Sequence, residues 1–350
     1  MISLTKTLIA LSITSTLMAS HVYADTSVRV LTQVLPTAKQ YPNEEAAITT
    51  LKSSDADFSV SYNNYEGLGL STADGLRLVS DNAFDIVSVQ IGTAARDDAF
   101  FEGLDLIGVS PDMDSLRVAV DAYRDVFDER LQSRFGAKVL ALWPFGPQVF
   151  YCNADINSVT DLQGLKVRSF TPSMSALLSS LGATPVTLNF GEVYPALQRG
   201  VADCGVTSPT SGNSAAWPEV TTHLLPLSVS GSVQGIFVNL KWWDSLSDNQ
   251  RSVITKTYKE LEKAQWGFAS EINDDAIACN TGSESCTDST PYKMKLVDVA
   301  DADRALVSKA ATEVVLSDWV SRCETSYKGC AEVWNETIGA ARGFTAVKPK

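Results

Sequence analysis

Apolar and polar positions alternate in a strand–helix order from the start of the chain. Residues 27–35 and 57–64 have the apolar spacing of β-strands, and residues 42–53 between them are typical of a helix. A helix at 74–80 and a strand at 85–89 continue the order. Strands that alternate with helices predict an α/β domain with a mainly parallel sheet.

A second block follows a long amphipathic helix predicted at residues 111–136. Asp114 or Ser115 is the expected cap of this helix, and Gly136 stands where a helix ends. Further strands and helices then alternate again, with strands at 137–145, 164–170, 182–190 and 201–209 and helices at 174–181 and 191–200. This pattern predicts a second α/β domain that starts near Lys138.

The remaining chain predicts one strand, a long helix and a short C-terminal part. Residues 230–243 are typical of a strand, and Ser247 with Gln250 fits a capping box at the start of the helix. A strand at 293–299 and a helix at 302–321 complete the pattern. Two domains joined by more than one crossing predict a cleft and a hinge, a layout that closes on ligands.

These elements divide the chain into lobes. The first lobe is predicted at residues 25–137 and is completed by part of 227–300, and the second lobe is predicted at 138–226. The helix at 244–275 is expected to span the lobes. Residues 276–350 are expected to form a C-terminal strand, a helix and a disulfide-closed tail.

Residues 1–24 have the features of a secretory signal peptide. Lys6 precedes an apolar run at Leu8–Leu17, and the small-residue rule places the cut after Ala24. The run is only about half of the roughly 20 residues that a spanning helix needs, so a membrane anchor is the weaker interpretation. We therefore expect export to the periplasm.

Charge and cysteine content narrow the possible partners. The formal net charge of −13 argues against nucleic acid and anionic membranes, although a local cluster of donors can still bind an anion. Six cysteines in an exported chain predict disulfides, and fifteen pairings are possible. The short spacings favour Cys279–Cys286 and Cys323–Cys330, which leaves Cys152–Cys204 by elimination. Zinc-type cysteine spacing is absent, so we expect no metal site.

The sequence shows no recognisable set of catalytic residues. One of the two histidines, His21, lies in the predicted signal peptide, and His223 is beside no nucleophile motif. Carboxylate pairs such as Asp112 and Asp114 lie near helix ends or in loops, where solvated acids are ordinary. An exported isomerase or lyase acting on organic acids remains an alternative, without a recognisable acid–base set.

Residues 157–205 resemble the DctP-type solute-binding proteins of TRAP transporters. The resemblance rests on motifs in the family's order and spacing: GLKVR at 164–168, LGATPV at 181–186, EVY at 192–194 and ALQRGVAD at 196–203. It implies a two-domain periplasmic binding protein of the type II-like α/β class, with a ligand cleft between the lobes. It also implies an organic acid as ligand, a TRAP membrane permease as partner and no cofactor. We expect a monomer, with a dimer left open.

The family's strand arginine maps onto Arg168 and implies a carboxylate anchor. A guanidinium suits this role because its planar fork meets both carboxylate oxygens. The alternative is an arginine on a solvated strand face, and the strand pattern alone does not decide between them. A second arginine of some sialic acid-binding relatives falls near Gln148, and Thr207 or Ser208 replaces an asparagine. These departures argue against a sugar-acid ligand.

Aromatic residues near predicted strand ends favour an aromatic or partly apolar monocarboxylate. They are Trp143, Phe145, Phe170, Phe190 and Trp217, and each is alternatively a core residue. The first lobe is expected to contribute residues at strand ends or turns, namely Gln33, Tyr65, Glu66 and Gln90. A ligand-sensing subunit of a signalling receptor would have the same fold, and the sequence does not separate it from a transport receptor.

Overall fold

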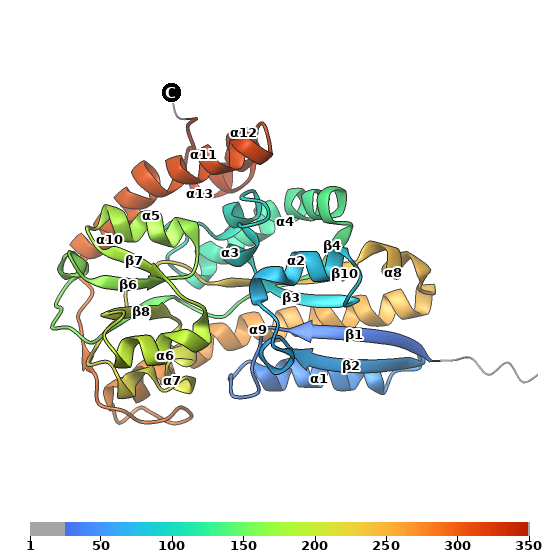
Figure 1. The fold of residues 1–350 in the computed structure, drawn as a ribbon, viewed down its shortest axis with the longest axis horizontal. Helices are drawn as coiled ribbons and strands as arrows, with labels where there is room; N and C mark the ends of the chain where they lie inside the picture. The colour runs from blue at the N-terminus through green and yellow to red at the C-terminus, as the bar shows by residue number, and fades with distance from the viewer. Residues whose placement is uncertain (1–24, 349–350) are drawn as a thin grey trace, which may run out of the picture.

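Two β-sheets, each covered by helices, form two lobes joined side by side (Figure 1). This computed structural model describes residues 25–348, so the predicted signal peptide at 1–24 lies outside the described residues. No helix of the described part of the chain is long and apolar enough to cross a membrane. The chain therefore has the predicted α/β class, with two lobes.

The sheet of the first lobe has five strands in the order β2-β1-β3-β10-β4. The strands are β1 (Thr26–Thr32), β2 (Phe58–Asn64), β3 (Ile86–Gln90), β4 (Ala137–Pro144) and β10 (Val233–Asn239). β1 is parallel to β2 and β3, whereas β10 is antiparallel to β3 and β4. Every residue of β3 and β10 is buried, as expected for central strands covered on both faces.

Helices lie on both faces of this sheet. One face contacts α1 (Tyr41–Lys52) and the long helix α9 (Asp248–Thr281), and the other contacts α2 (Gly75–Ser80) and α4 (Met113–Phe135). The cap of α4 is Asp112, not Asp114 or Ser115 as predicted. Ser115 is the N3 partner in the same capping box, because Asp112 accepts its backbone N–H at 2.7 Å.

The second sheet has six strands in the order β11-β9-β5-β8-β6-β7. They are β5 (Val149–Cys152), β6 (Lys166–Ser169), β7 (Thr184–Thr187), β8 (Cys204–Thr207), β9 (His223–Leu225) and the two-residue β11 (Lys295–Leu296). Its helices are α5 (Pro172–Ser180), α6 (Phe190–Gln198) and α7 (Pro209–Ser214). The predicted strand at 293–299 is thus reduced to β11.

The position of β4 corrects one predicted boundary. The sequence placed this strand in the second lobe, but β4 pairs along its length with β10 in the first sheet. We therefore propose that the lobes divide between Pro144 and Val149. The connecting segments 145–148 and 229–232 pair with each other, with Gln148 N donating to Ser230 O at 2.8 Å and Val229 N donating to Gln148 O at 3.0 Å. They form a two-stranded connection between the sheets.

The long helix α9 (Asp248–Thr281) contacts both lobes. Ser247 and Gln250 form the predicted capping box at its start. Trp266 Nε1 donates to Leu142 O of β4 at 2.8 Å, and Asn280 Nδ2 donates to Tyr151 Oη of β5 at 2.7 Å. The helix runs behind the lobes from one to the other (Figure 1).

The C-terminal helices pack across the top of both lobes in Figure 1. They are α10 (Asp301–Ala310), α11 (Leu316–Ser326), α12 (Cys330–Trp334) and α13 (Ala340–Arg342). Two other short helices, α3 (Ile91–Ala94) and α8 (Leu240–Ser245), directly follow β3 and β10. The helix predicted at 302–321 is interrupted by a π-helical turn at Ala311–Val315. The structure contains the disulfides Cys152–Cys204, Cys279–Cys286 and Cys323–Cys330, the same three pairs that the sequence predicts.

Candidate functional site

The candidate site centres on Arg168, near the end of β6 and close to the first lobe. Its side chain is only 5% exposed. Nη1 donates to Val206 O at 2.7 Å, Nε donates to Leu188 O at 3.2 Å, and the guanidinium carbon lies 4.6 Å from the centre of the Phe170 ring. Two backbone carbonyls and one aromatic face thus fix the orientation of the guanidinium.

Arg168 is a buried cation without an anionic partner in the described part of the chain. Its strand neighbour Lys166 lies 3.9 Å from Asp203, but Arg168 forms no such ion pair. Burial lowers the pKa of Arg168 to about 9, so the guanidinium is still charged at neutral pH. A buried charge without a partner is costly, and Nη2 makes no hydrogen bond to a described residue. The site therefore favours an anion beside Nη2.

Three further predicted residues lie at the same edge of the second sheet. Gln148 directly precedes β5, and the register pairs Val149 with Thr207 at the end of β8. Gln148 Nε2 donates to Gly146 O at 2.8 Å, and Ser208 Oγ accepts the N–H of Ser211 at 3.2 Å as the cap of α7. Gln148, Thr207 and Ser208 are all buried.

Two first-lobe residues are brought together at the end of β3. Gln90 Oε1 accepts the N–H of Thr93 at 3.0 Å, and its Nε2 donates to Ser232 Oγ at 3.3 Å. Gln33 Oε1 accepts the backbone N–H of Gln90 at 3.1 Å. Gln33 and Gln90 therefore form one polar group at the ligand-facing end predicted for the first sheet.

The lobes touch directly between this group and the segment after Arg168. A Cβ added to Gly92 would lie 2.1 Å from Thr171 Cγ2 and 3.2 Å from Gln90 Oε1. Position 92 therefore has no room for a side chain. The contact places the first-lobe group beside the β6–α5 junction, which carries Phe170 and Thr171.

The predicted aromatic residues are not all at this boundary. Trp217 is fully buried in the core of the second lobe, where its ring would lie 2.7 Å from a Cβ on Gly205. Phe190 begins α6 rather than ending a strand, and it stacks on Trp217 at 5.4 Å. Trp143 is also fully buried and belongs to β4 of the first sheet, with its ring 5.0 Å from that of Phe145. Of the five predicted aromatic residues, Phe145, Phe170 and Phe190 are half-buried and the two tryptophans are fully buried.

Tyr65 and Glu66 directly follow β2, whose last residue Asn64 pairs with Thr32, so they lie at the same end of the first sheet as Gln33. Tyr65 is 2% exposed, and its hydroxyl donates to Ser88 O at 3.1 Å. Tyr65 therefore packs within the first lobe. Glu66 is exposed in the short turn Glu66–Leu68. Ligand contact by either residue stays a prediction.

Sequence reasoning missed two acidic residues near the boundary. Glu102 is 1% exposed, and its Oε1 accepts the N–H of Ser173 in α5 at 2.7 Å. Asp105 accepts the Ser230 hydroxyl at 2.9 Å in the connection between the lobes and Val233 N at 3.0 Å at the start of β10. The signal was present, because both acids stand among apolar residues in FFEGLDLIG at 100–108.

Comparison with known proteins places these features in a family. A model of the family "Bacterial extracellular solute-binding protein, family 7" matches residues 118–315. A C4-dicarboxylate-binding periplasmic protein of Rhodobacter capsulatus is 28% identical over 179 residues, which are 51% of this chain and 54% of the relative. A sialic acid-binding periplasmic protein of Vibrio cholerae is 29% identical over 159 residues, which are 45% and 49% of the two chains. The chain thus matches about half the length of these curated relatives.

Solved structures are similar over nearly the whole chain. An extracytoplasmic solute receptor of Bordetella pertussis binding pyroglutamic acid has a TM-score of 0.77 and 17% identity, covering 89% of this chain and 99% of that chain. A TRAP periplasmic solute-binding protein of Desulfovibrio salexigens with bound orotic acid has a TM-score of 0.78 and 16% identity, covering 90% and 99%. At these identities the likeness shows the two-domain fold alone.

Proposed function

Because the chain belongs to the family of bacterial extracellular solute-binding proteins, family 7, we propose that it is an extracytoplasmic solute receptor. It captures an organic carboxylate between its two lobes and delivers it to the membrane permease of a TRAP transporter. The solved relatives with bound organic acids support this choice of ligand class. Lobe closure would follow from contacts that the ligand makes with both lobes.

The observation that carries the proposal is the buried, unpaired guanidinium of Arg168. Its two carbonyl acceptors leave Nη2 available, and the ring of Phe170 lies against its face. A carboxylate at this position gains charge-assisted hydrogen bonds and relieves the cost of the buried cation. We assign Arg168 the role of carboxylate anchor.

The rest of the ligand is proposed to be aromatic or partly apolar. Phe170, Phe145 and Phe190 are half-buried, so each has some ring surface available at or near the second-sheet edge. Trp143 and Trp217 do not support this assignment, because both are fully packed. Pyroglutamic and orotic acid, the ligands of two similar structures, are ring carboxylates of this kind.

A thermal-shift assay with four carboxylates tests the anchor. The panel contains pyroglutamate, orotate, succinate and glucuronate, and each bound ligand should raise the melting temperature with RT ln(1 + [L]/Kd). Arg168→Ala should cost on the order of 2–5 kcal/mol of binding free energy and remove the shift. Arg168→Lys should keep the charge but lose part of the affinity, since the planar fork is absent.

Arg199→Ala is the matched control, because Arg199 is an exposed arginine of the same lobe. It should leave the ligand-induced shift unchanged. If Arg168→Ala keeps the affinity of the unmodified protein, Arg168 is not the anchor. If none of the four acids binds and none co-purifies with the protein, the receptor assignment itself is wrong.

A further inference from the structure

Glu102 connects three parts of the chain at the start of α5. It lies in the 3₁₀ turn Phe101–Asp105 of the first lobe, and its side chain is 1% exposed. Oε1 accepts the backbone N–H of Ser173 in the second lobe at 2.7 Å. Oε2 lies 2.7 Å from Nη1 of Arg322 in α11. One buried carboxylate thus links both lobes and the C-terminal helices.

Glu102 accepts a backbone N–H at the start of α5 that has no acceptor within the helix itself. Thr171 caps this nine-residue helix by accepting the N–H of Met174 at 3.0 Å, but the N–H of Ser173 finds its acceptor only in Glu102. Ser173 is fully buried, so loss of Glu102 would leave its N–H without a partner and without water. A carboxylate at a helix N-terminus is also favoured by the helix dipole.

Hydrogen bonds from the C-terminal helices and to β10 fix the turn that carries Glu102. Trp319 Nε1 donates to Ala99 O at 2.7 Å, and Trp334 Nε1 donates to Gly103 O at 2.9 Å. A Cβ on Gly103 would lie 2.6 Å from the Trp319 ring, so the turn and α11 pack without space between them. Asp105, at the end of the turn, accepts Val233 N at 3.0 Å at the start of β10 and the Ser230 hydroxyl at 2.9 Å in the connection between the lobes. Glu102 is therefore presented from a rigid support.

We propose that Glu102 is a positioning residue for the Arg168 site, an inference that rests on the proposed function. Arg168 is separated from α5 only by the short junction that carries Phe170 and Thr171. By fixing the first turn of α5 to the first lobe, Glu102 fixes this junction and holds the lobes in register. The C-terminal helices take part through Arg322.

Asp318 provides a matched control for Glu102. Both carboxylates pair with Arg322, since Asp318 Oδ2 accepts Arg322 Nε at 2.8 Å. Asp318 is 41% exposed, and within the described part of the chain its ion pair is with Arg322 of the same helix, α11. Asp318→Asn therefore removes a charge partner of Arg322 without touching the second lobe, whereas Glu102→Ala removes the link between the lobes.

Amide exchange of Ser173 measures the link without any ligand. We expect Glu102→Ala to accelerate exchange of the Ser173 N–H by about tenfold, because a hydrogen bond to a charged acceptor is lost. Asp318→Asn should leave this rate unchanged. Glu102→Gln, which keeps an acceptor oxygen for Ser173, should restore most of the protection. If Glu102→Ala does not fold, Glu102→Asp gives the test of loss, because its shorter side chain withdraws the carboxylate from the Ser173 N–H. Unchanged exchange in Glu102→Ala, or loss of protection in Asp318→Asn equal to that in Glu102→Ala, would overturn the proposal.

Two further readouts separate positioning from simple stabilisation. Spin labels at the exposed positions Thr50 in α1 and Gln198 in α6 report the distance between the lobes, and Glu102→Ala should broaden its distribution while Asp318→Asn should not. Binding of pyroglutamate should weaken at least about tenfold in Glu102→Ala, and by less in an Arg168→Lys background, because both changes act on one site. If pyroglutamate does not bind the unmodified protein, its role as ligand fails, while exchange and distance still decide the role of Glu102.

Discussion

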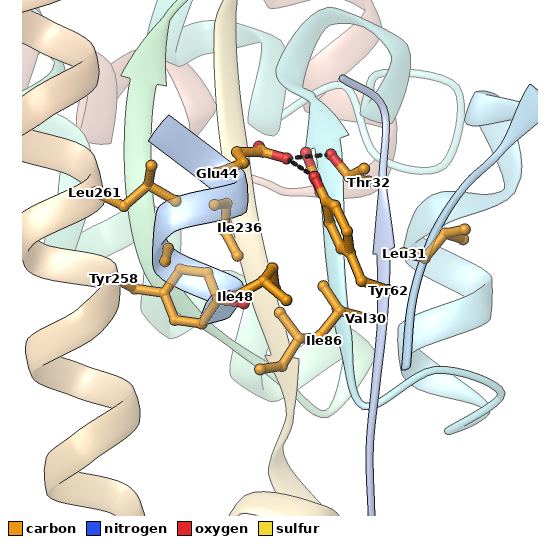
Figure 2. Close-up of a pocket in the computed structure, with 12 residues that line it drawn as sticks. Val30, Leu31, Thr32, Glu44, Ile48, Tyr62, Ile86, Ile236, Tyr258 and Leu261 are labelled. Atoms are coloured by element: carbon orange, nitrogen blue, oxygen red, sulfur yellow. Dashed lines mark hydrogen bonds between the residues drawn. The ribbon is translucent and has the colours of Figure 1, made fainter. Parts of the chain in front are cut away.

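Arg168 and Glu44 are both buried ionisable side chains, but their surroundings differ. Arg168 donates only to neutral backbone carbonyls in the described part of the chain, and we propose that its remaining N–H groups bind an anion. Glu44 Oε2 accepts the hydroxyls of Thr32 at 2.6 Å and Tyr62 at 2.8 Å (Figure 2). Among the described residues, Glu44 Oε1 has no hydrogen-bond partner, and the hydroxyl of Tyr258, which lines the same small cavity, has none either. Burial raises the pKa of Glu44.

This raised pKa predicts a pH-dependent part of the stability. The folded-state pKa of Glu44 lies above the unfolded value of about 4.3, so its contribution is complete below that pH and is lost as the pH rises through the folded pKa. Glu44→Gln should remove this dependence, and urea unfolding at several pH values measures it. Glu45→Gln, at the exposed neighbour, should keep the slope of the unmodified protein. An identical slope in Glu44→Gln and the unmodified protein would show that the fold does not raise the pKa of Glu44.

At the level of strands and helices, the disulfide Cys152–Cys204 joins β5 to β8 beside the candidate site. Cys152 and Cys204 are register partners in these antiparallel strands. The 52-residue separation between them contains β6, α5 and Arg168. The covalent link therefore closes the segment that carries the second-lobe part of the candidate site.

Removal of this disulfide should cost more stability than removal of a short-loop disulfide. The chain-entropy relation gives about 4 kcal/mol for the Cys152–Cys204 loop and about 2 kcal/mol for Cys279–Cys286, which closes a separation of 7 residues. Denaturant unfolding of the two double Cys→Ala variants measures the difference. Non-reducing peptide mapping should find Cys152 joined to Cys204. A different partner would refute the pairing.

Helices and strands with a clear local sequence pattern were predictable, but the elements against which they pair or pack were not. The capping box at Ser247 and Gln250 and the alternation in β1 and β2 are local features, so they appear in the sequence. The sheet to which β4 belongs depends on its pairing with β10, nearly 100 residues later, and no local pattern encodes it. Trp217 shows the same limit, since a tryptophan after a polar loop has no local mark of burial.

The site was predictable to a similar extent. The family motif indicated Arg168, but the sequence did not indicate that its carbonyl acceptors come from Leu188 and Val206. Glu102 was missed because its partners, Ser173 and Arg322, lie 71 residues and more away. An acidic residue within an apolar segment of this chain therefore indicates a buried polar contact, although only the tertiary structure identifies its partner.

At the scale of the whole molecule, the acidic charge opposes the proposed ligand. The chain has a formal net charge of −13, whereas the proposed anchor is one buried cation. Repulsion between an anionic ligand and an acidic protein slows their encounter, and salt screens this repulsion.

The association rate of an anionic ligand should therefore rise with ionic strength. Stopped-flow tryptophan fluorescence with pyroglutamate, at ionic strengths of roughly 0.01 M and 0.15 M, measures this rate, because the Debye length falls from about 30 Å to about 8 Å. A rate that falls as salt is added would show that a local positive field around Arg168 dominates over the net charge.

A crystal structure of the protein with the organic acid that co-purifies with it tests the role of Arg168 most directly. We expect a carboxylate between the lobes, with one oxygen within hydrogen-bond distance of Arg168 Nη2 and the face of Phe170 still against the guanidinium. An acid bound elsewhere, with no contact to Arg168, would contradict it.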